Sequence, residues 1–221
     1  MSTHQLIDYR PPPDLGLVPL FCDQHLIVID KPSGLLSVPG RGEAFADCMA
    51  ARVQARYPDA LIVHRLDMDT SGLLLMARGK EMQRLLSELF LRREVDKRYQ
   101  AVVHGRVEDD DGLVDLPLIT DWPNRPRQTV DHEIGKPSQT RYWVRDRDAQ
   151  AGVSRVDLEP ITGRSHQLRV HMLALGHAIV GDPLYGPAAS AGGRLLLHAA
   201  ELRFTHPVSG QQLSLASAVP F

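Results

Sequence analysis

The chain has 221 residues, and 25 Lys and Arg stand against 27 Asp and Glu, which gives a formal net charge of -2. This length fits one large domain or two smaller ones, and the balanced charge argues against an extended nucleic-acid surface, which needs local positive charge. The chain has no apolar run long enough for a membrane span, no secretion signal, and no metal or disulfide pattern at Cys22 and Cys48, so we expect a cytoplasmic protein.

The first hundred residues predict short strands and two helices. Residues 1–20 are rich in proline and are expected to form an extended arm. Residues 44–57 favour a helix that Pro58 would end. A second helix is predicted from Lys80 to Arg93, where apolar residues recur at helical spacing. Apolar runs predict three strands, at Leu26–Ile29, Leu61–Val63 and Leu73–Met76.

The remainder predicts mainly strands. One helix is expected from Ser165, which suits the N-cap, to about Leu175, with Gly176 as the C-terminal cap. This order of elements suggests an α+β fold, in which a large mixed sheet carries a few helices within a single domain over residues 21–221. The predicted strands are Tyr99–His104, Leu113–Leu118, Thr140–Val144, Val153–Leu158, Leu195–Phe204 and Gln212–Ala216.

Polar residues concentrate between two predicted strands, from His64 to Gly72. A turn in which Asp and Ser side chains bond the backbone would explain them without any function. Asp67 and Asp69 also suggest the paired carboxylates of magnesium-dependent phosphotransferases. In those enzymes the Thr comes one place later than Thr70 does here, and no His-Arg pair interrupts the preceding strand.

Basic residues form three clusters, and each is either a solvated surface or an RNA contact. Arginine binds phosphate with its planar fork, and an exposed aromatic ring stacks on a base. His166 and His171 are five residues apart, which places them on different faces of a helix or a strand, so no metal-binding pair is predicted. The clusters are Arg92, Arg93, Lys97 and Arg98; Trp122, Arg125 and Arg127; and Arg164 and Arg169.

Four motifs, in order, resemble those of the RluA-type pseudouridine synthase family. His64–Asp67, followed by Thr70–Leu74, resembles its catalytic motif. The block Gly181–Gly186 is also similar, and the likeness extends from about Leu26 to the C-terminus. The other three motifs are Lys31–Leu35, Lys97–Tyr99 and Gly163–His171.

The resemblance implies the pseudouridine synthase fold, with a mainly antiparallel sheet and no S4-type RNA-binding domain before Lys31. It implies a monomeric enzyme that isomerises uridine in a 23S rRNA hairpin loop and in the tRNA anticodon stem-loop. No cofactor, metal or membrane partner is expected. The alternative is an RNA-binding protein of the same fold that has lost activity.

Residue roles also follow from the resemblance. Asp67 is expected to act as nucleophile or base, Arg169 to pair with it, and Tyr99 to lie against the target base. Arg65 is expected to enter the RNA helix and displace that base, at a cost of a few kcal/mol. Judged without the family, Tyr99 would be an ordinary strand residue and Arg65 a surface cation. The further residues expected to bind substrate are His64, Arg164, Lys31, Trp122 and Arg125.

Overall fold

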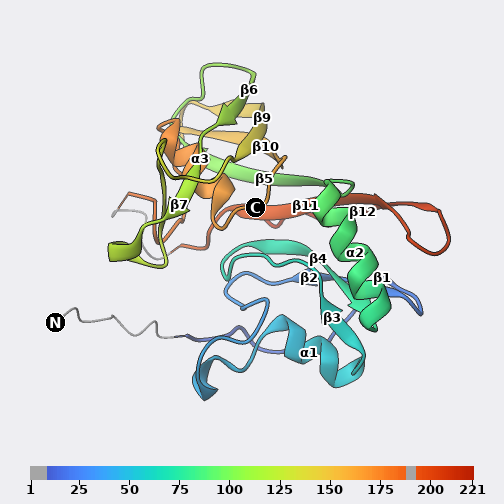
Figure 1. The fold of residues 1–221 in the computed structure, drawn as a ribbon. Coiled ribbons are helices and arrows are strands. Elements are labelled where there is room, and N and C mark those ends of the chain that lie inside the picture. Colours follow the sequence, from blue (N-terminus) through green and yellow to red (C-terminus); the bar gives the residue numbers. More distant parts are fainter. Residues whose placement is uncertain (1–8, 188–192) are drawn as a thin grey trace.

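A computed structural model describes residues 9–187 and 193–221. Within them, ten strands form one sheet with the order β1-β2-β4-β11-β5-β10-β9-β6, while β3 pairs with β4 and β12 with β11 (Figure 1). Neighbouring strands are antiparallel except β11 and β4, which are parallel. The predicted α+β class and mixed, mainly antiparallel sheet are confirmed. The strands are β1 (Phe21–Cys22), β2 (Leu26–Lys31), β3 (Ala60–Ile62), β4 (Ser71–Arg78), β5 (Asp96–His104), β6 (Asp111–Asp115), β9 (Gln139–Asp148), β10 (Val153–Pro160), β11 (Leu197–Thr205) and β12 (Gln212–Ala216).

Strands β2 and β4 are covered on both faces. Ile27 and Ile29 pack in one core cluster with α1 (Met49–Arg56), and Leu26 and Val28 pack in another with α2 (Lys80–Arg92). Each fully buried Leu or Ile stabilises the fold by about 1.5–3 kcal/mol. Double burial explains why these strands have continuous apolar sequences, which were correctly predicted as strands.

Strands β5, β9 and β10 are covered on one face only. Leu168 and Met172 of α3 (Gln167–Ala174) pack in one cluster with Val156 and Leu158 of β10. On the opposite face, the buried carboxylate of Asp157 pairs with Arg145, whose side chain is 61% exposed. Antiparallel sheets commonly pack one face against the core and turn the other toward solvent. Here the apolar face of the sheet determines the side on which α3 lies.

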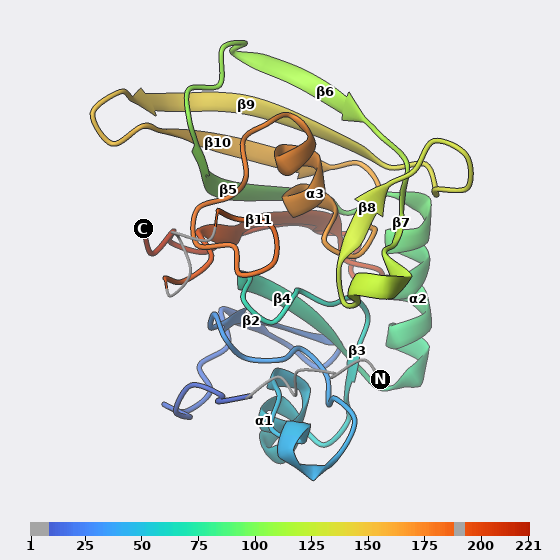
Figure 2. The ribbon, with the colours of Figure 1, turned by 90° about the vertical axis from the view of Figure 1, so that its left-hand side faces the viewer.

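A separate two-stranded hairpin lies beside α3 in both views (Figures 1 and 2). It consists of β7 (Leu118–Thr120) and β8 (Gln128–Val130), and its tip carries a 3-10 turn at Trp122–Asn124. Leu118 packs with Val170 of α3 and with Tyr185. This contact anchors the base of the hairpin and leaves the tip exposed.

Some predicted boundaries were wrong. The predicted strand Leu113–Leu118 is two strands, β6 and β7, because Pro117 has no N–H to donate within a ladder. The helix predicted over 44–57 begins only at Met49, after a 3-10 turn at Glu43–Phe45. The strand predicted over Leu26–Ile29 continues through Lys31 as β2.

The N-terminal arm was expected over residues 1–20. Residues 1–8 lie outside the described residues, and residues 9–19 form neither helix nor strand. The Tyr9 hydroxyl donates to the carbonyl of Asp47 at 2.8 Å, which ties this segment to the body of the protein. No helix in the described ranges is both long and apolar enough to span a membrane.

Candidate active site

A cavity of about 980 Å³ is bounded by the β3–β4 loop, α2, the β7–β8 hairpin and the segment from Pro160 to Arg169. Asp67 is the one carboxylate among its lining residues, which are all within the described part of the chain. Six basic side chains line the same cavity, so it is locally positive although the whole chain is not. They are Arg65, Arg93, Lys97, Arg125, Arg164 and Arg169.

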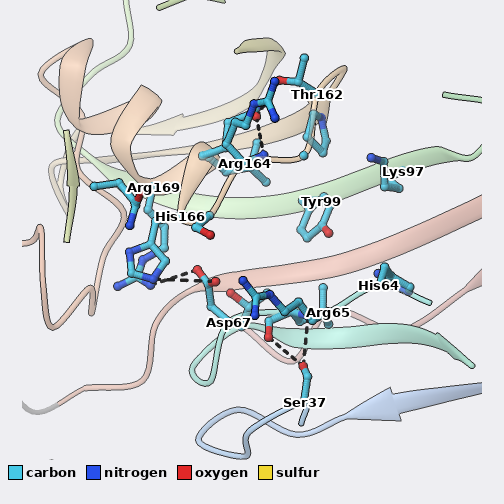
Figure 3. Close-up of a pocket in the computed structure, with 18 of the residues that line it drawn as sticks. Ser37, His64, Arg65, Asp67, Lys97, Tyr99, Thr162, Arg164, His166 and Arg169 are labelled. Carbon is cyan, nitrogen blue, oxygen red and sulfur yellow. Dashed lines mark hydrogen bonds and ion pairs between the residues drawn. The ribbon is translucent and has the colours of Figure 1, made fainter. Parts of the chain in front are cut away.

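Lys31 at the end of β2 and Ser37 in the segment after it support the loop that carries Asp67. The Lys31 ammonium donates to the carbonyls of Pro32, Leu35 and Met68 at 2.6–2.9 Å. Ser37 Oγ donates to the carbonyl of Leu66 at 2.7 Å and accepts from its amide at 3.1 Å (Figure 3). These bonds fix the backbone on both sides of Asp67.

Lys31 therefore does not fit its predicted contact with substrate. Its side chain is fully buried and all three of its donors are used within the protein. The sequence motif was recognised correctly, but this lysine supports the loop and does not reach the cavity.

Gly72 lets this loop join the sheet where β4 runs parallel to β11. A Cβ on this residue would lie 2.4 Å from the carbonyl oxygen of Ala199, and its φ is +110°. Only glycine adopts that conformation at such a close approach without strain. Ser71 and Gly72 are the first residues of β4, and their pairing with β11 fixes the end of the Asp67 loop.

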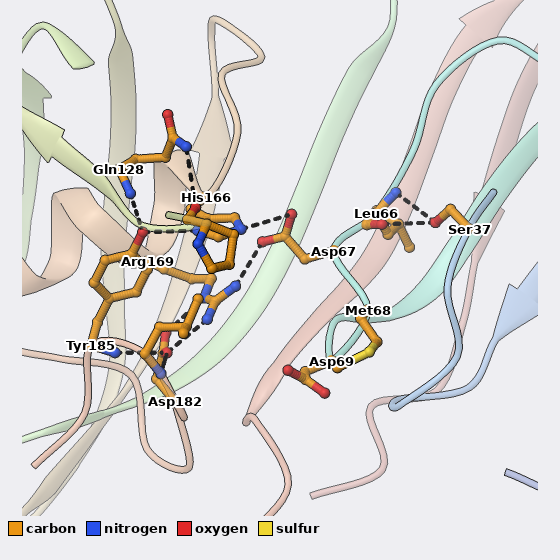
Figure 4. Close-up of polar contacts among 12 residues, drawn as sticks. Ser37, Leu66, Asp67, Met68, Asp69, Gln128, His166, Arg169, Asp182 and Tyr185 are labelled. Carbon is orange, nitrogen blue, oxygen red and sulfur yellow. Dashed lines mark hydrogen bonds and ion pairs between the residues drawn. The ribbon is translucent and has the colours of Figure 1, made fainter. Parts of the chain in front are cut away.

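Arg169 of α3 contacts Asp67, with Nη1 and Oδ2 separated by 3.1 Å. The same guanidinium makes a two-pronged pair with Asp182, at 2.7 Å on each side (Figure 4). Arg169 and Asp182 are buried, whereas the Asp67 side chain remains 27% exposed toward the cavity. Asp182 thus fixes the position of the Arg169 guanidinium, whose Nη1 contacts Asp67. Burial would raise the pKa of Asp182, but Arg169 outweighs it and holds that pKa below its usual value.

A second contact to Asp67 comes from His166, whose Nε2 lies 3.9 Å from Asp67 Oδ1. Its other ring nitrogen, Nδ1, is 2.8 Å from the hydroxyl of Tyr185, and that hydroxyl accepts from the backbone N–H of Gln128 at 2.7 Å (Figure 4). His166 has a left-handed backbone with φ of 53°, and burial lowers its pKa, which Asp67 partly opposes.

The start of α3 was predicted wrongly at Ser165. The helix begins at Gln167, whose side-chain oxygen accepts from the Arg164 amide and from the Thr162 hydroxyl. The N-cap residue is His166, whose side chain makes no capping bond to the helix. Gln167 instead holds the preceding loop, and the left-handed turn at His166 aims its ring at Asp67. The C-terminal end agrees with expectation, because Gly176 follows the cap with φ of +85°.

Tyr99 and His64 lie on the side of the cavity formed by β5 and the β3–β4 loop (Figure 3). Burial, with Asp67 nearby, raises the pKa of Tyr99, so its phenol is neutral at neutral pH. His64 stacks on Phe90 at 4.6 Å between ring centroids, and its Nε2 accepts from the Leu75 amide. Burial lowers the pKa of His64 to about 3. His64 therefore supports the cavity wall as a neutral ring.

The remaining predicted residues lie around the rim. Arg65 and Arg164 are exposed cavity residues. Trp122, at the hairpin tip, is 65% exposed, and the Arg125 guanidinium stacks 4.6 Å from its ring centroid. Such an exposed pair offers a flat cationic surface, and a purely packing role for Trp122 does not fit.

The predicted cluster Arg92–Arg98 is divided by the fold. Arg93 and Lys97 line the cavity, whereas Arg92 pairs with Glu88 of the same helix at 3.9 Å. Arg98 stacks on Trp143 at 4.1 Å and lines a separate, smaller pocket. Sequence proximity overstated this cluster because alternate strand residues point to opposite faces.

The phosphotransferase alternative gains no support from the second aspartate. Burial raises the pKa of Asp69, which disfavours the ionised form that would bind a cation, and its side chain points away from Asp67 (Figure 4). His171 is also accounted for, because its two nitrogens contact the Thr140 hydroxyl and the Leu116 carbonyl.

Sequence reasoning gave no role to Asp182 or Tyr185. Both lie in Gly181–Gly186, a block noticed only as similar to the family. Asp182 Oδ1 accepts from the amides of Leu184 and Tyr185, which builds a tight turn. The Asp-Pro pair at Asp182 predicts a turn. The contacts of Asp182 with Arg169 and of Tyr185 with His166 could not be inferred from sequence spacing.

Known proteins of one family are similar to this chain. The family model described as RNA pseudouridylate synthase matches residues 25–174. The "Dual-specificity RNA pseudouridine synthase RluA" of Escherichia coli strain K12 is 52% identical over 216 residues, covering 97% of this chain and 98% of that protein. The protein of that name from Pasteurella multocida is 50% identical over 218 residues, covering 98% and 99%. The structure of "Human RNA Pseudouridylate Synthase Domain Containing 1" has a TM-score of 0.79 and 29% identity, covering 96% of this chain and 87% of that one.

Proposed function

This chain belongs to the RNA pseudouridine synthase family, and from that premise we propose that Asp67 is the residue with which it isomerises uridine in RNA. The reaction breaks the N-glycosidic bond of uridine and rejoins the uracil through C5 to C1′ of the same ribose. No atoms are gained or lost and no oxidation occurs, so the chemistry requires a carboxylate and exclusion of water. The observation that carries the assignment is a single carboxylate, held by Arg169, within a basic cavity.

Asp67 acts in one of two ways, either attacking C1′ or removing a proton from the ribose. Both require an ionised carboxylate with one face open to substrate. Arg169 contacts only one of its oxygens, and the side chain keeps 27% of its surface exposed. Neutral Tyr99, from β5, supplies an aromatic surface beside the cavity against which a displaced uracil can lie.

Delivery of a uridine to this cavity requires that the base leave its stack, which costs a few kcal/mol. Exposed Arg65, two residues before Asp67 in the chain, is placed to occupy the vacated position in the RNA. The rim residues Arg164, Arg125 and Trp122 are placed to recover the cost through phosphate contacts and stacking. His64 contributes indirectly by shaping the wall, and Lys31 by holding the Asp67 loop.

We further propose that the substrates are a 23S rRNA hairpin loop and the tRNA anticodon stem-loop, modified by a monomer in the cytoplasm. Relatives at 50–52% identity are called dual-specificity enzymes. A recognition surface confined to one cavity and one hairpin suits a short stem-loop with an accessible loop, and not a long sequence.

Release of tritium from RNA labelled at uracil C5 tests the activity, with EDTA present to exclude a magnesium phosphotransferase. Wild-type protein should release tritium and form pseudouridine, while Asp67→Asn should fold and release none. Turnover by Asp67→Asn would end the assignment of Asp67. RNA binding without release by the wild type would instead favour the non-catalytic alternative.

Substrate choice is tested with isolated stem-loops of fewer than about 20 nucleotides, a size that a local surface can cover. The anticodon arm and the ribosomal hairpin should both be full substrates. Modification of intact ribosomal particles alone would contradict this and would require a second contact surface.

A further inference from the structure

Tyr185 and His166 form a hydrogen-bonded connection that ends at Asp67, and the reaction described above uses neither residue. The Tyr185 hydroxyl lies between the Gln128 amide, at 2.7 Å, and His166 Nδ1, at 2.8 Å. His166 Nε2 then faces Asp67 Oδ1 at 3.9 Å, the oxygen that Arg169 does not contact. Tyr185 is buried, and these two contacts are the hydrogen bonds of its hydroxyl among the described residues.

The direction of each hydrogen bond follows from the donors available. The backbone N–H of Gln128 can only donate, so it occupies one lone pair of the tyrosine oxygen. The hydroxyl hydrogen then needs an acceptor, and within the described residues His166 Nδ1 is the one within reach. The reverse arrangement would leave a buried hydroxyl hydrogen unpaired, which costs free energy.

This direction decides which nitrogen of His166 carries the hydrogen. Burial lowers the pKa of His166, so its ring is neutral at neutral pH and has a single N–H. Because Nδ1 accepts from Tyr185, that hydrogen must be on Nε2. Nε2 then presents an N–H to the Asp67 carboxylate, whereas the other tautomer would present a lone pair to a negative charge.

We propose that Tyr185 is a positioning residue for the isomerisation: its hydroxyl fixes the tautomer of His166, whose Nε2–H holds and stabilises the free oxygen of ionised Asp67. The gap of 3.9 Å is long for a hydrogen bond in the protein without RNA. Catalytic hydrogen bonds are often long before substrate binds and shorten in the complex. Arg169 and His166 would then hold one carboxylate oxygen each, both oriented from the turn at Asp182–Tyr185.

The test compares Tyr185→Phe, His166→Asn and the double variant. Tyr185→Phe removes only the hydroxyl. His166→Asn tolerates the left-handed backbone, and its amide can reach Tyr185 but not Asp67. Tyr142→Phe is the matched control, because Tyr142 is a buried tyrosine of β9 that does not line the cavity. Circular dichroism and thermal unfolding establish that each variant is folded.

Single-turnover rates at saturating stem-loop RNA are measured beside the dissociation constant for that RNA. Each single variant should lose about 10- to 100-fold in rate, as for a hydrogen bond to a charged group, with affinity unchanged. The double variant should fall less than about 2-fold further, because Tyr185 acts through His166. Tyr142→Phe should keep the wild-type rate.

The proposal would be overturned if either single variant kept the wild-type rate. It would also be overturned if the rate losses of the two single variants were additive in the double variant, or if the variants lost only affinity for RNA. If Tyr185→Phe fails to fold, the rate of His166→Asn decides it. The inference rests on the proposed role of Asp67, and the two fail differently. An active Asp67→Asn protein removes that role, whereas an inactive Asp67→Asn beside a fully active His166→Asn removes only this inference.

Discussion

The variant Asp182→Asn tests how far the buried Asp182 carboxylate stabilises the protein and positions Arg169. The side chain of Asp182 has no exposed surface, and its two oxygens bind Arg169 Nε and Nη2 at 2.7 Å each. The amide variant keeps an acceptor for the Leu184 and Tyr185 amides, so the turn is preserved. What is lost is the negative charge that balances a buried guanidinium, together with the oxygen that accepts from Arg169 Nε.

Loss of one partner from a buried ion pair costs about 3–5 kcal/mol in stability. Arg169 keeps Asp67 as a partner at 3.1 Å, which favours the lower end, about 3 kcal/mol. For a chain of this size each kcal/mol lowers the melting temperature by about 2–4 °C, so a fall of roughly 6–12 °C is expected. Activity should fall as well, because a freed guanidinium no longer holds Asp67 in one position.

Thermal unfolding and tritium release measure the two effects on the same samples. Arg169→Met/Asp182→Asn is the matched control, since it strands no charge and should be more stable than Asp182→Asn while remaining inactive. A melting temperature and rate equal to wild type in Asp182→Asn would refute the reasoning, because the pair would then neither stabilise the fold nor position Asp67.

Three further outcomes are expected. Trp122→Ala and Arg125→Ala should weaken RNA binding by about 1–3 kcal/mol each without slowing single turnover at saturating RNA; a slower saturated rate with normal affinity would contradict a role in binding. The free energy of unfolding should decrease as pH falls from 6.5 toward about 3, because His64 stays neutral in the folded protein and is protonated in the unfolded chain. In His64→Gln, the free energy of unfolding measured with urea should depend less steeply on pH in this range, by about 1.4 kcal/mol per pH unit. The logarithm of RNA affinity should fall with the logarithm of salt concentration with a slope near -3 to -4, about 0.7 for each of five cavity cations other than Arg169; a slope near zero would exclude phosphate contacts by these residues.

Local patterns predicted the parts of the fold that depend on neighbouring residues. The strand β12 was predicted with its observed bounds, and α2 within one residue of its end at Arg92. The end of α3 was also foreseen, because Gly176 adopts the positive φ that a helix terminus needs. In these segments burial, periodicity and capping agree, so the sequence alone is informative.

The site was predicted less completely, because its supporting contacts join distant segments. Asp67 and Arg169 are 102 positions apart and were connected only through resemblance to a family. Lys31 was assigned to substrate for the same reason, since a motif records that a residue matters without recording which way it points. The left-handed turn at His166 depends on a buried glutamine and a distant tyrosine, which no local propensity encodes.

Net charge was the least informative of the sequence measures, and the placement of ion pairs explains why. Acidic side chains neutralise arginines away from the cavity, as Asp47 does for Arg52, Asp59 for Arg78, and Glu201 for Arg203. Inside the cavity one carboxylate faces six basic groups, and Arg169 is the one that contacts it. The remaining cations are free of carboxylate partners within 4.0 Å among the described residues, so a chain with a net charge of -2 still has a positive surface around the one carboxylate that lines this cavity.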